Sequence, residues 1–229
     1  MKIYSIICTR DKNLTPLTSN LVHTLSSYGV EVKLLVNQKS IFEAYKKGLK
    51  SCNANNNDII ICCHDDLVLT SSKTQFIASV AKCTDKKVGF IGPAGTTYLG
   101  KDAVWWNHDN WQAGYHRGFV KHYSMKDKQA HGTHYGPHGP VVVLDGLFLA
   151  ATKEVWEKVG LDKPTYYEGE WDFYDIHYTS RAHLLGLQNL TITMEIVHYS
   201  AGDLAGRDSW HKNREAFIAN TTLPLILNG

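Results

Sequence analysis

Several features of secreted, membrane-spanning and disulfide-linked proteins are missing from this sequence. Its apolar runs are only as long as a strand, well short of the roughly 18 to 20 residues that cross a bilayer, and its first residues show no signal-peptide cleavage pattern. The 5 cysteines include no CxxC pair, which favours buried free thiols over disulfides or zinc. We therefore expect a cytoplasmic protein without a transmembrane segment.

A large charge of either sign is also missing. The sequence has 24 Lys+Arg against 22 Asp+Glu, a formal net charge of +2. This balance argues against nucleic acid as a partner, because proteins that bind it usually carry a strong basic excess. The phosphate-binding pattern GxxxxGK(S/T) does not occur either, which excludes a P-loop site.

Short apolar runs alternate with amphipathic segments over the first 95 residues. Predicted strands lie at 3–8, 30–36, 58–63 and 88–91, and predicted helices lie at 17–28, 41–50 and 73–82. Repeated strand, helix, strand units predict an α/β fold with a mostly parallel mixed sheet flanked by helices. Ligands of such sheets bind outside the carboxyl ends of the strands. With 229 residues and no long Pro, Gly or Ser tract, a single domain is expected.

Residues 96–140 lack a clear period and are rich in aromatic residues and histidine. This pattern predicts a loop-rich insertion or a hairpin flap. Trp105 and Trp106 either offer planes to sugar rings or cover the core. The six histidines between His108 and His138 do not have the spacing of a zinc site, which favours incidental imidazoles on a surface loop.

The later part of the chain returns to strands and helices. Strands are predicted at 141–144 and 190–197, and helices at 152–159 and 176–185. Thr152 is the expected cap of the first of these helices.

Two carboxylates follow the predicted strand at 58–63 almost directly. Asp65 and Asp66 come after His64, and adjacent carboxylates at a strand end repel each other and lose hydration. They are hard to keep ionised without a cation, so the sequence predicts a divalent metal here. His198 ends the predicted strand at 190–197 and is a candidate ligand, because imidazole with carboxylates suits Mn²⁺ or a similar ion.

A second acidic cluster precedes the predicted helix at 176–185. Glu168, Glu170, Asp172 and Asp175 alternate there with aromatic residues. Asp175 lies closest to the helix start, where the macrodipole favours a negative charge. The cluster holds either a catalytic carboxylate that acts as general base or an ordinary acidic helix start.

Together these residues resemble the nucleotide-diphospho-sugar glycosyltransferases of the GT-A fold, specifically the small glycosyltransferase-like group related to family 2. His64-Asp65-Asp66 occupies the place of the DxD motif of that family. The run from Ser40 to Gly48 resembles its "SI..AYN.G" signature, with Lys46 in place of the usual asparagine. Residues 170–175, with the helix that follows, resemble its "ED" element. The resemblance covers nearly the whole chain.

The resemblance implies a metal-dependent transferase that moves a sugar from a nucleoside-diphosphate sugar to a hydroxyl of a glycan or another acceptor. It implies Mn²⁺ or Mg²⁺ as cofactor and favours a UDP-sugar over a GDP-sugar. It divides the chain into a nucleotide-binding half at 1–95, a flap at 96–140 and an acceptor and metal half at 141–229. One base without a second nucleophilic carboxylate predicts inversion at the anomeric carbon.

The resemblance also implies roles for individual residues. Asp66 and His198 are implied as metal ligands, with Asp65 beside the metal or the ribose and His64 as a spacer. Asp175 is implied as the catalytic residue, with Asp172 or Glu170 as alternatives. Residues implied in donor binding are Thr9, Arg10, Asn37, Asp65, Gly92, Asp145, Gly146 and Lys212.

Two other functions stay open at this point. A nucleotidyltransferase of sugar phosphates also uses strand-end carboxylates with a metal, although its first strand is usually followed by a Gly-rich loop, and residues 9–12 contain no glycine. A non-catalytic module that binds nucleotide sugars or glycans would not need Asp175.

Overall fold

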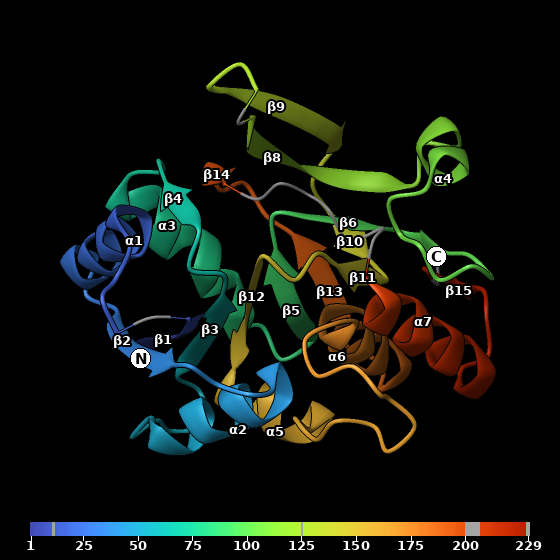
Figure 1. Cartoon of the computed structure of the whole chain (residues 1–229), viewed down its shortest axis with the longest axis horizontal. Coiled ribbons are helices and arrows are strands. Elements are labelled where there is room, and N and C mark those ends of the chain that lie inside the picture. The colour runs from blue at the N-terminus through green and yellow to red at the C-terminus, as the bar shows by residue number, and fades with distance from the viewer. Residues whose placement is uncertain (11, 125, 200–206, 228–229) are drawn as a thin grey trace.

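A seven-stranded mixed sheet forms the centre of the computed structural model, which describes residues 1–10, 12–124, 126–199 and 207–227 (Figure 1). In spatial order its strands are β10 (Pro140–Val141), β13 (Gln188–Thr191), β5 (Val88–Gly92), β12 (Phe148–Thr152), β3 (Ile59–Cys63), β1 (Ile3–Thr9) and β2 (Glu31–Val36). Strands β13, β5, β3, β1 and β2 run in one direction, and β10 and β12 run in the other. The carboxyl ends of β1, β2 and β3 therefore share one edge.

Helices cover both faces of this sheet. They are α1 (Pro16–Ser27), α2 (Ile41–Ser51), α3 (Lys73–Val80), continued by the 3-10 turn η1 (Ala81–Thr84), α5 (Lys153–Val159) and α6 (Tyr174–Leu184). Side chains of Thr15, Ser40, Ser72 and Thr152 cap four of them, as expected of hydroxyl residues before a helix. The predicted alternation of strands and helices is confirmed, including the cap at Thr152.

The two faces can be told apart by the residues that pack on them. Ile6 lies against Gly48 of α2, where a Cβ on the glycine would come within 2.5 Å of the Ile6 side chain. Phe148 packs against Phe76 of α3 on the other face, because Phe148 pairs with Cys63 and Cys63 with Ile7. Both faces are buried, which explains the continuous apolar runs of β1 and β3.

A second sheet lies beyond the carboxyl ends of the central strands (Figure 1). Its strand order is β11 (Val143–Leu144), β6 (Ala94–Thr96), β8 (His116–Ser124), β14 (Ile196–His198) and β4 (Leu67–Leu69), with β9 (Gln129–Gly136) paired to β8. The remaining elements are α4 (His108–Gln112), α7 (Asp208–Asn220) and a small sheet of β7 (Tyr98–Leu99) and β15 (Leu225–Ile226).

Two predicted strands are each divided between the two sheets, which corrects the sequence interpretation. Residues 141–144 contribute the end of β10 to the central sheet and β11 to the second sheet, and the chain turns between them at Val142. Likewise the segment at 190–197 leaves β13 after Thr191 and enters β14 at Ile196. These apolar runs read as single strands because they stay largely buried while they pass between sheets.

For residues 96–140 the structure shows the hairpin alternative. Strands β8 and β9 pair over their length and project from the second sheet (Figure 1). Trp105 is only 2% exposed and covers the core, whereas Trp106 is 40% exposed and packs against Trp210. His116 is not on a surface loop, because it is buried and donates a hydrogen bond to the Trp105 carbonyl.

The cysteines agree with the expectation of free thiols. All five cysteines are free, and Cys8 alone among them is partly accessible. Within the described part of the chain, no helix combines the length and the apolar character that crossing a membrane requires.

Candidate functional site

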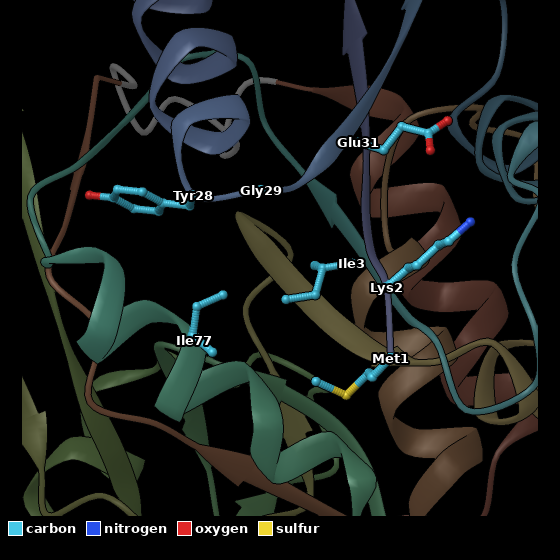
Figure 2. A pocket seen from close by; sticks show the side chains of 7 residues that line it. All are labelled: Met1, Lys2, Ile3, Tyr28, Gly29, Glu31 and Ile77. Carbon is cyan, nitrogen blue, oxygen red and sulfur yellow. The ribbon is translucent and has the colours of Figure 1, made fainter.

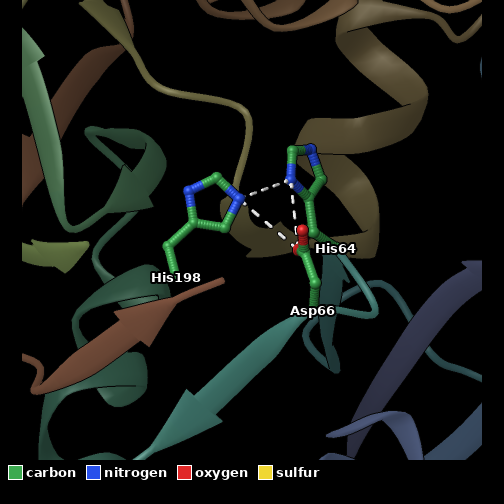
Figure 3. A group of neighbouring side chains, drawn as sticks. All are labelled: His64, Asp66 and His198. Atoms are coloured by element: carbon green, nitrogen blue, oxygen red, sulfur yellow. Dashed lines mark hydrogen bonds and ion pairs between the residues drawn. The ribbon is translucent and has the colours of Figure 1, made fainter. Parts of the chain in front are cut away.

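His64, Asp66 and His198 meet at the seam between the two sheets (Figure 3). His64 follows β3, Asp66 precedes β4, and antiparallel pairing of β14 with β4 sets His198 opposite Leu67. His198 Nε2 lies 3.4 Å from Asp66 Oδ1 and 3.4 Å from His64 Nδ1. His64 Nδ1 lies 3.9 Å from Asp66 Oδ1.

Burial and neighbouring charges shift the pKa values of all three side chains, and for Asp66 and His198 these two effects oppose each other. Burial alone would favour neutral Asp66, but contact with His198 and the nearby charge of His64 hold the pKa of Asp66 below its ordinary value. Burial also opposes a charge on His198, yet the carboxylate of Asp66 raises the pKa of that imidazole. Burial and the charge of His198 lower the pKa of His64. The Oδ1 atom of Asp66 is buried without a hydrogen-bond donor of good geometry.

These three side chains fit a divalent transition-metal ion. Two ligands bound to one ion at about 2.1 Å lie about 3.0 to 3.4 Å apart at octahedral or tetrahedral angles, close to the separations observed here. A set of two imidazoles and one carboxylate suits Mn²⁺, Fe²⁺, Co²⁺ or Zn²⁺ better than Mg²⁺. The unpartnered Asp66 oxygen points to the same conclusion, because a buried carboxylate oxygen ordinarily has a partner. Within the described ranges, no other group of three such side chains comes as close together.

The geometry bears on two expectations at this strand end. Nδ1 of His64, the expected spacer, lies in one group with the ligand atoms of Asp66 and His198. The carboxylate of Asp65 lies outside that group of ligand atoms, and its backbone carbonyl accepts a hydrogen bond from Thr18 Oγ1 in α1.

Asp175 lies in the first turn of α6, directly after a strained residue. Phe173 caps the helix in the left-handed region, with φ of 66°, which non-glycine residues rarely adopt away from functional sites. Asp175 Oδ2 accepts a hydrogen bond of 3.0 Å from the Gly146 backbone N–H. Burial, helped by the charge of Asp145, raises the pKa of Asp175 to about 7. This carboxyl is thus poised to exchange a proton near neutral pH.

Tyr174 connects Asp175 to the histidine and aspartate group. Its hydroxyl lies 2.8 Å from His64 Nε2 and donates to the Gly146 carbonyl at 3.1 Å. Gly146 makes room for both residues of the helix start, because a Cβ there would lie 2.5 Å from Tyr174 Oη and 2.9 Å from Asp175 Cβ. Because Gly146 has no side chain, the first turn of α6 can pack directly against its backbone.

The other two acids proposed for catalysis are held in ion pairs. Glu170 pairs with Lys163, which lowers the pKa of the carboxyl. Asp172 is buried and accepts a 2.6 Å hydrogen bond from Ser209 Oγ, with Arg207 Nη1 at 3.4 Å, at the start of α7. Asp175, with its raised pKa, thus differs from Glu170, whose pKa is lowered.

Of the residues expected to bind the donor, three lie at the carboxyl edge of the sheet and Gly92 lies where two strands approach each other. Thr9 ends β1, and its carbonyl accepts a hydrogen bond from the Asn37 N–H after β2, so both lie at the sheet edge that carries His64. Arg10 is exposed at the same edge. A Cβ on Gly92 would meet the Phe148 carbonyl at 2.8 Å, so this glycine allows β5 to approach β12.

Asp145 and Lys212 make contacts within the chain. Asp145 Oδ1 accepts a hydrogen bond from the Leu147 N–H in the turn before β12. The ammonium of Lys212 pairs with Glu168 at 3.0 Å and with Asp208 at 3.2 Å on the exposed side of α7. The contact of Lys212 with the diphosphate stays a prediction.

Sequence reasoning missed three residues beside this site. His64 lies in the DxD-like motif and Tyr174 within residues 170–175, and these two motif matches are the signal that could have drawn attention to them. His122 gave no such signal. It pairs with His198 across β8 and β14, with ring centroids 5.8 Å apart, and this proximity depends on the second sheet.

A pocket of about 340 Å³ opens far from this group. Its lining comes from the amino ends of β1 and β2 and from neighbouring helices (Figure 2), namely Met1, Lys2, Ile3, Tyr28, Gly29, Glu31 and Ile77. This is the edge of the sheet opposite the one that binds ligands in α/β folds, and we assign no ligand to it.

The sheet order and the strand-end group define an α/β protein of the GT-A class. Residues 5–220 match the glycosyltransferase-like family, so the chain belongs to that family. The expected family and fold class are thereby confirmed. No curated protein matches this sequence.

Solved structures with the same fold are distant in sequence. The structure of A197 from STIV has a TM-score of 0.50 and 14% identity, and the match covers 87% of this chain and 86% of that one. The structure of GalNAc-T7 with UDP, GalNAc and Mn²⁺ has a TM-score of 0.58 and 9% identity, over 96% of this chain and 48% of that one. This chain thus corresponds to about half of GalNAc-T7, and at such identities the likeness shows the fold alone.

Proposed function

We propose that this member of the glycosyltransferase-like family transfers a sugar from a nucleoside-diphosphate sugar to an acceptor hydroxyl, with a divalent cation at the donor. The observation that carries the proposal is that possible metal ligands and a possible general base lie at one edge of the sheet. His64, Asp66 and His198 offer three ligand atoms to one cation, and Asp175 offers a base with a pKa of about 7. Tyr174 and Gly146 connect the two.

On the donor side, His64, Asp66 and His198 would hold the cation. Mn²⁺ bound there would act as a Lewis acid and stabilise the negative charge of the leaving diphosphate. Thr9 and Asn37, at the ends of β1 and β2, would then contact the nucleotide. A UDP-sugar is the donor class we favour, since the structurally similar GalNAc-T7 was crystallised with UDP and Mn²⁺.

On the acceptor side, Asp175 would take the proton of the attacking hydroxyl. A base is most effective when its pKa lies near the working pH, because it is then partly ionised and still basic. The Gly146 N–H and the start of α6 stabilise its ionised form, while burial and Asp145 keep the affinity for a proton high. One base without a nucleophilic partner predicts inversion at the anomeric carbon.

The test is incubation with UDP-, GDP- and dTDP-sugars, with and without Mn²⁺. Release of nucleoside diphosphate supports a transferase, release of pyrophosphate indicates a nucleotidyltransferase, and no turnover with saturable binding indicates a binding module. Asp175→Asn should lower turnover by about 10² to 10⁴-fold, while Glu170→Gln should retain it. NMR of the product reports the anomeric configuration, and retention would overturn the single-base mechanism. The cytoplasmic location stays a prediction.

A further inference from the structure

The Tyr174 hydroxyl lies between a ring nitrogen of His64 and a backbone carbonyl. Its oxygen is 2.8 Å from His64 Nε2 and 3.1 Å from the carbonyl oxygen of Gly146. The tyrosine is only 7% exposed, and its ring lies edge-on to that of Tyr45. Burial raises the pKa of this hydroxyl, whereas a hydrogen bond with the Tyr45 side chain lowers it, so Tyr45 is the donor in that contact. The single hydrogen of Tyr174 is then shared between the His64 and Gly146 contacts.

That single hydrogen decides which tautomer His64 adopts. The Gly146 carbonyl can only accept, so in the 3.1 Å contact the hydroxyl is the donor. The hydroxyl oxygen can then only accept from His64, which places the ring hydrogen of a neutral His64 on Nε2. The other ring nitrogen, Nδ1, is left with its lone pair.

The lone pair of Nδ1 faces the other two side chains of the group. Figure 3 shows Nδ1 on the side of the ring toward His198 and Asp66, with Nε2 directed away from them. With the opposite tautomer, an N–H would point into the group and compete with a cation. Second-shell partners of metal-binding imidazoles commonly fix the tautomer in this way.

We propose that Tyr174 is a positioning residue that holds neutral His64 as the Nε2–H tautomer and so makes Nδ1 available to a cation. The inference rests on the proposed cation-binding group, and it goes further by giving a role to a tyrosine that is neither a metal ligand nor the base. Gly146 belongs to the same device, since any side chain there would displace the hydroxyl.

The first test needs neither a variant nor a metal. Long-range ¹H–¹⁵N NMR of histidine-labelled protein, at a pH where the rings are neutral, distinguishes a protonated Nε2 from a protonated Nδ1. We expect His64 to carry its hydrogen on Nε2 in the metal-free wild-type protein. A hydrogen on Nδ1 would overturn the proposal, whether or not the protein turns out to be a glycosyltransferase.

The second test compares two matched variants. Tyr174→Phe removes the hydroxyl that contacts His64, and Tyr178→Phe removes another buried hydroxyl of α6, which donates to the Leu161 carbonyl at 3.1 Å. We expect Tyr174→Phe to mix the two tautomers of His64 and to weaken Mn²⁺ binding by about 10 to 100-fold. Tyr178→Phe keeps the ring that packs against Tyr174 and removes only a hydroxyl bonded to Leu161, so both properties should stay within about twofold of wild type.

The His64 tautomer and the Mn²⁺ affinity together show whether the positioning role or the proposed metal dependence is wrong. Wild-type tautomer and wild-type Mn²⁺ affinity in Tyr174→Phe would refute the positioning role. Equal losses in both tyrosine variants would also refute it, because they would reveal a general loss of packing in α6. If wild type binds no Mn²⁺ but keeps the Nε2–H tautomer that Tyr174→Phe disturbs, the positioning role stands and the proposed metal dependence fails.

Discussion

The stability of the Asp175→Asn variant should depend on pH in a direction that reveals the raised pKa. The pKa of Asp175 rises from an ordinary 3.8 to about 7, chiefly through burial. At about 1.4 kcal/mol for each pKa unit, the folded protein carries a penalty of about 4 kcal/mol when this side chain is ionised. The penalty is absent below pH 4, grows between pH 4 and 7, and is complete above pH 7.

Asparagine at this position removes the charge and keeps the shape. Part of the gain is offset because the amide is a weaker acceptor for the Gly146 N–H, so we expect a net stabilisation of about 1 to 3 kcal/mol at pH 8. At pH 4 the variant and wild type should differ little. Urea unfolding at pH 4, 6 and 8 measures the difference, and the same variant should show the lowered turnover expected above.

A carboxylate with the opposite shift serves as control. Asp58 accepts hydrogen bonds from the backbone of Lys2 at 2.7 Å and Asn55 at 2.8 Å, which lower the pKa of that side chain. Asp58→Asn should therefore cost stability at pH 7, and that cost should shrink as the pH falls through the pKa of the folded state. A stability difference for Asp175→Asn that does not vary with pH, or that is unfavourable at pH 8, would refute the reasoning.

Three further results are expected. Asp66→Asn should weaken Mn²⁺ binding by at least about 10-fold in calorimetry, whereas Asp65→Asn, the same change one position earlier, should alter it by less than about threefold. Gly146→Ala should cost about 1 to 3 kcal/mol in chemical denaturation, because the new methyl group would lie 2.5 Å from a hydroxyl oxygen, and an undiminished stability would contradict that contact. Trp105→Ala should cost about 3 to 5 kcal/mol and Trp106→Ala much less, so equal losses in thermal unfolding would contradict their different burial.

Much of the fold could be predicted because its signals are local. Hydroxyl caps such as Ser40 and Thr152 lie next to the helices that they start, and the apolar run of β3 reflects burial on both faces. The position of Asp66 at a strand end followed from the same pattern. The division of 141–144 and 190–197 between sheets could not be predicted, since the side chains stay largely buried through both changes of sheet.

The site was harder to predict because its contacts join distant parts of the chain. The proximity of His64 to His198 depends on the pairing of β14 with β4, and the Tyr174 contact depends on the approach of α6 to Gly146. Lys212 had the charge expected for a diphosphate contact, but its partners Glu168 and Asp208 became visible only in the folded chain. Spacing in the sequence carries no record of such pairings.

A cation bound at the seam between the two sheets would link them to each other. His64 leaves the central sheet, and His198 ends a strand of the second sheet, 134 positions later in the chain. An ion shared by these side chains would fasten the two sheets together and close a long loop of the polypeptide. Loading with Mn²⁺ should then raise the melting temperature by mass action, because the ion would bind the folded chain and not the unfolded one.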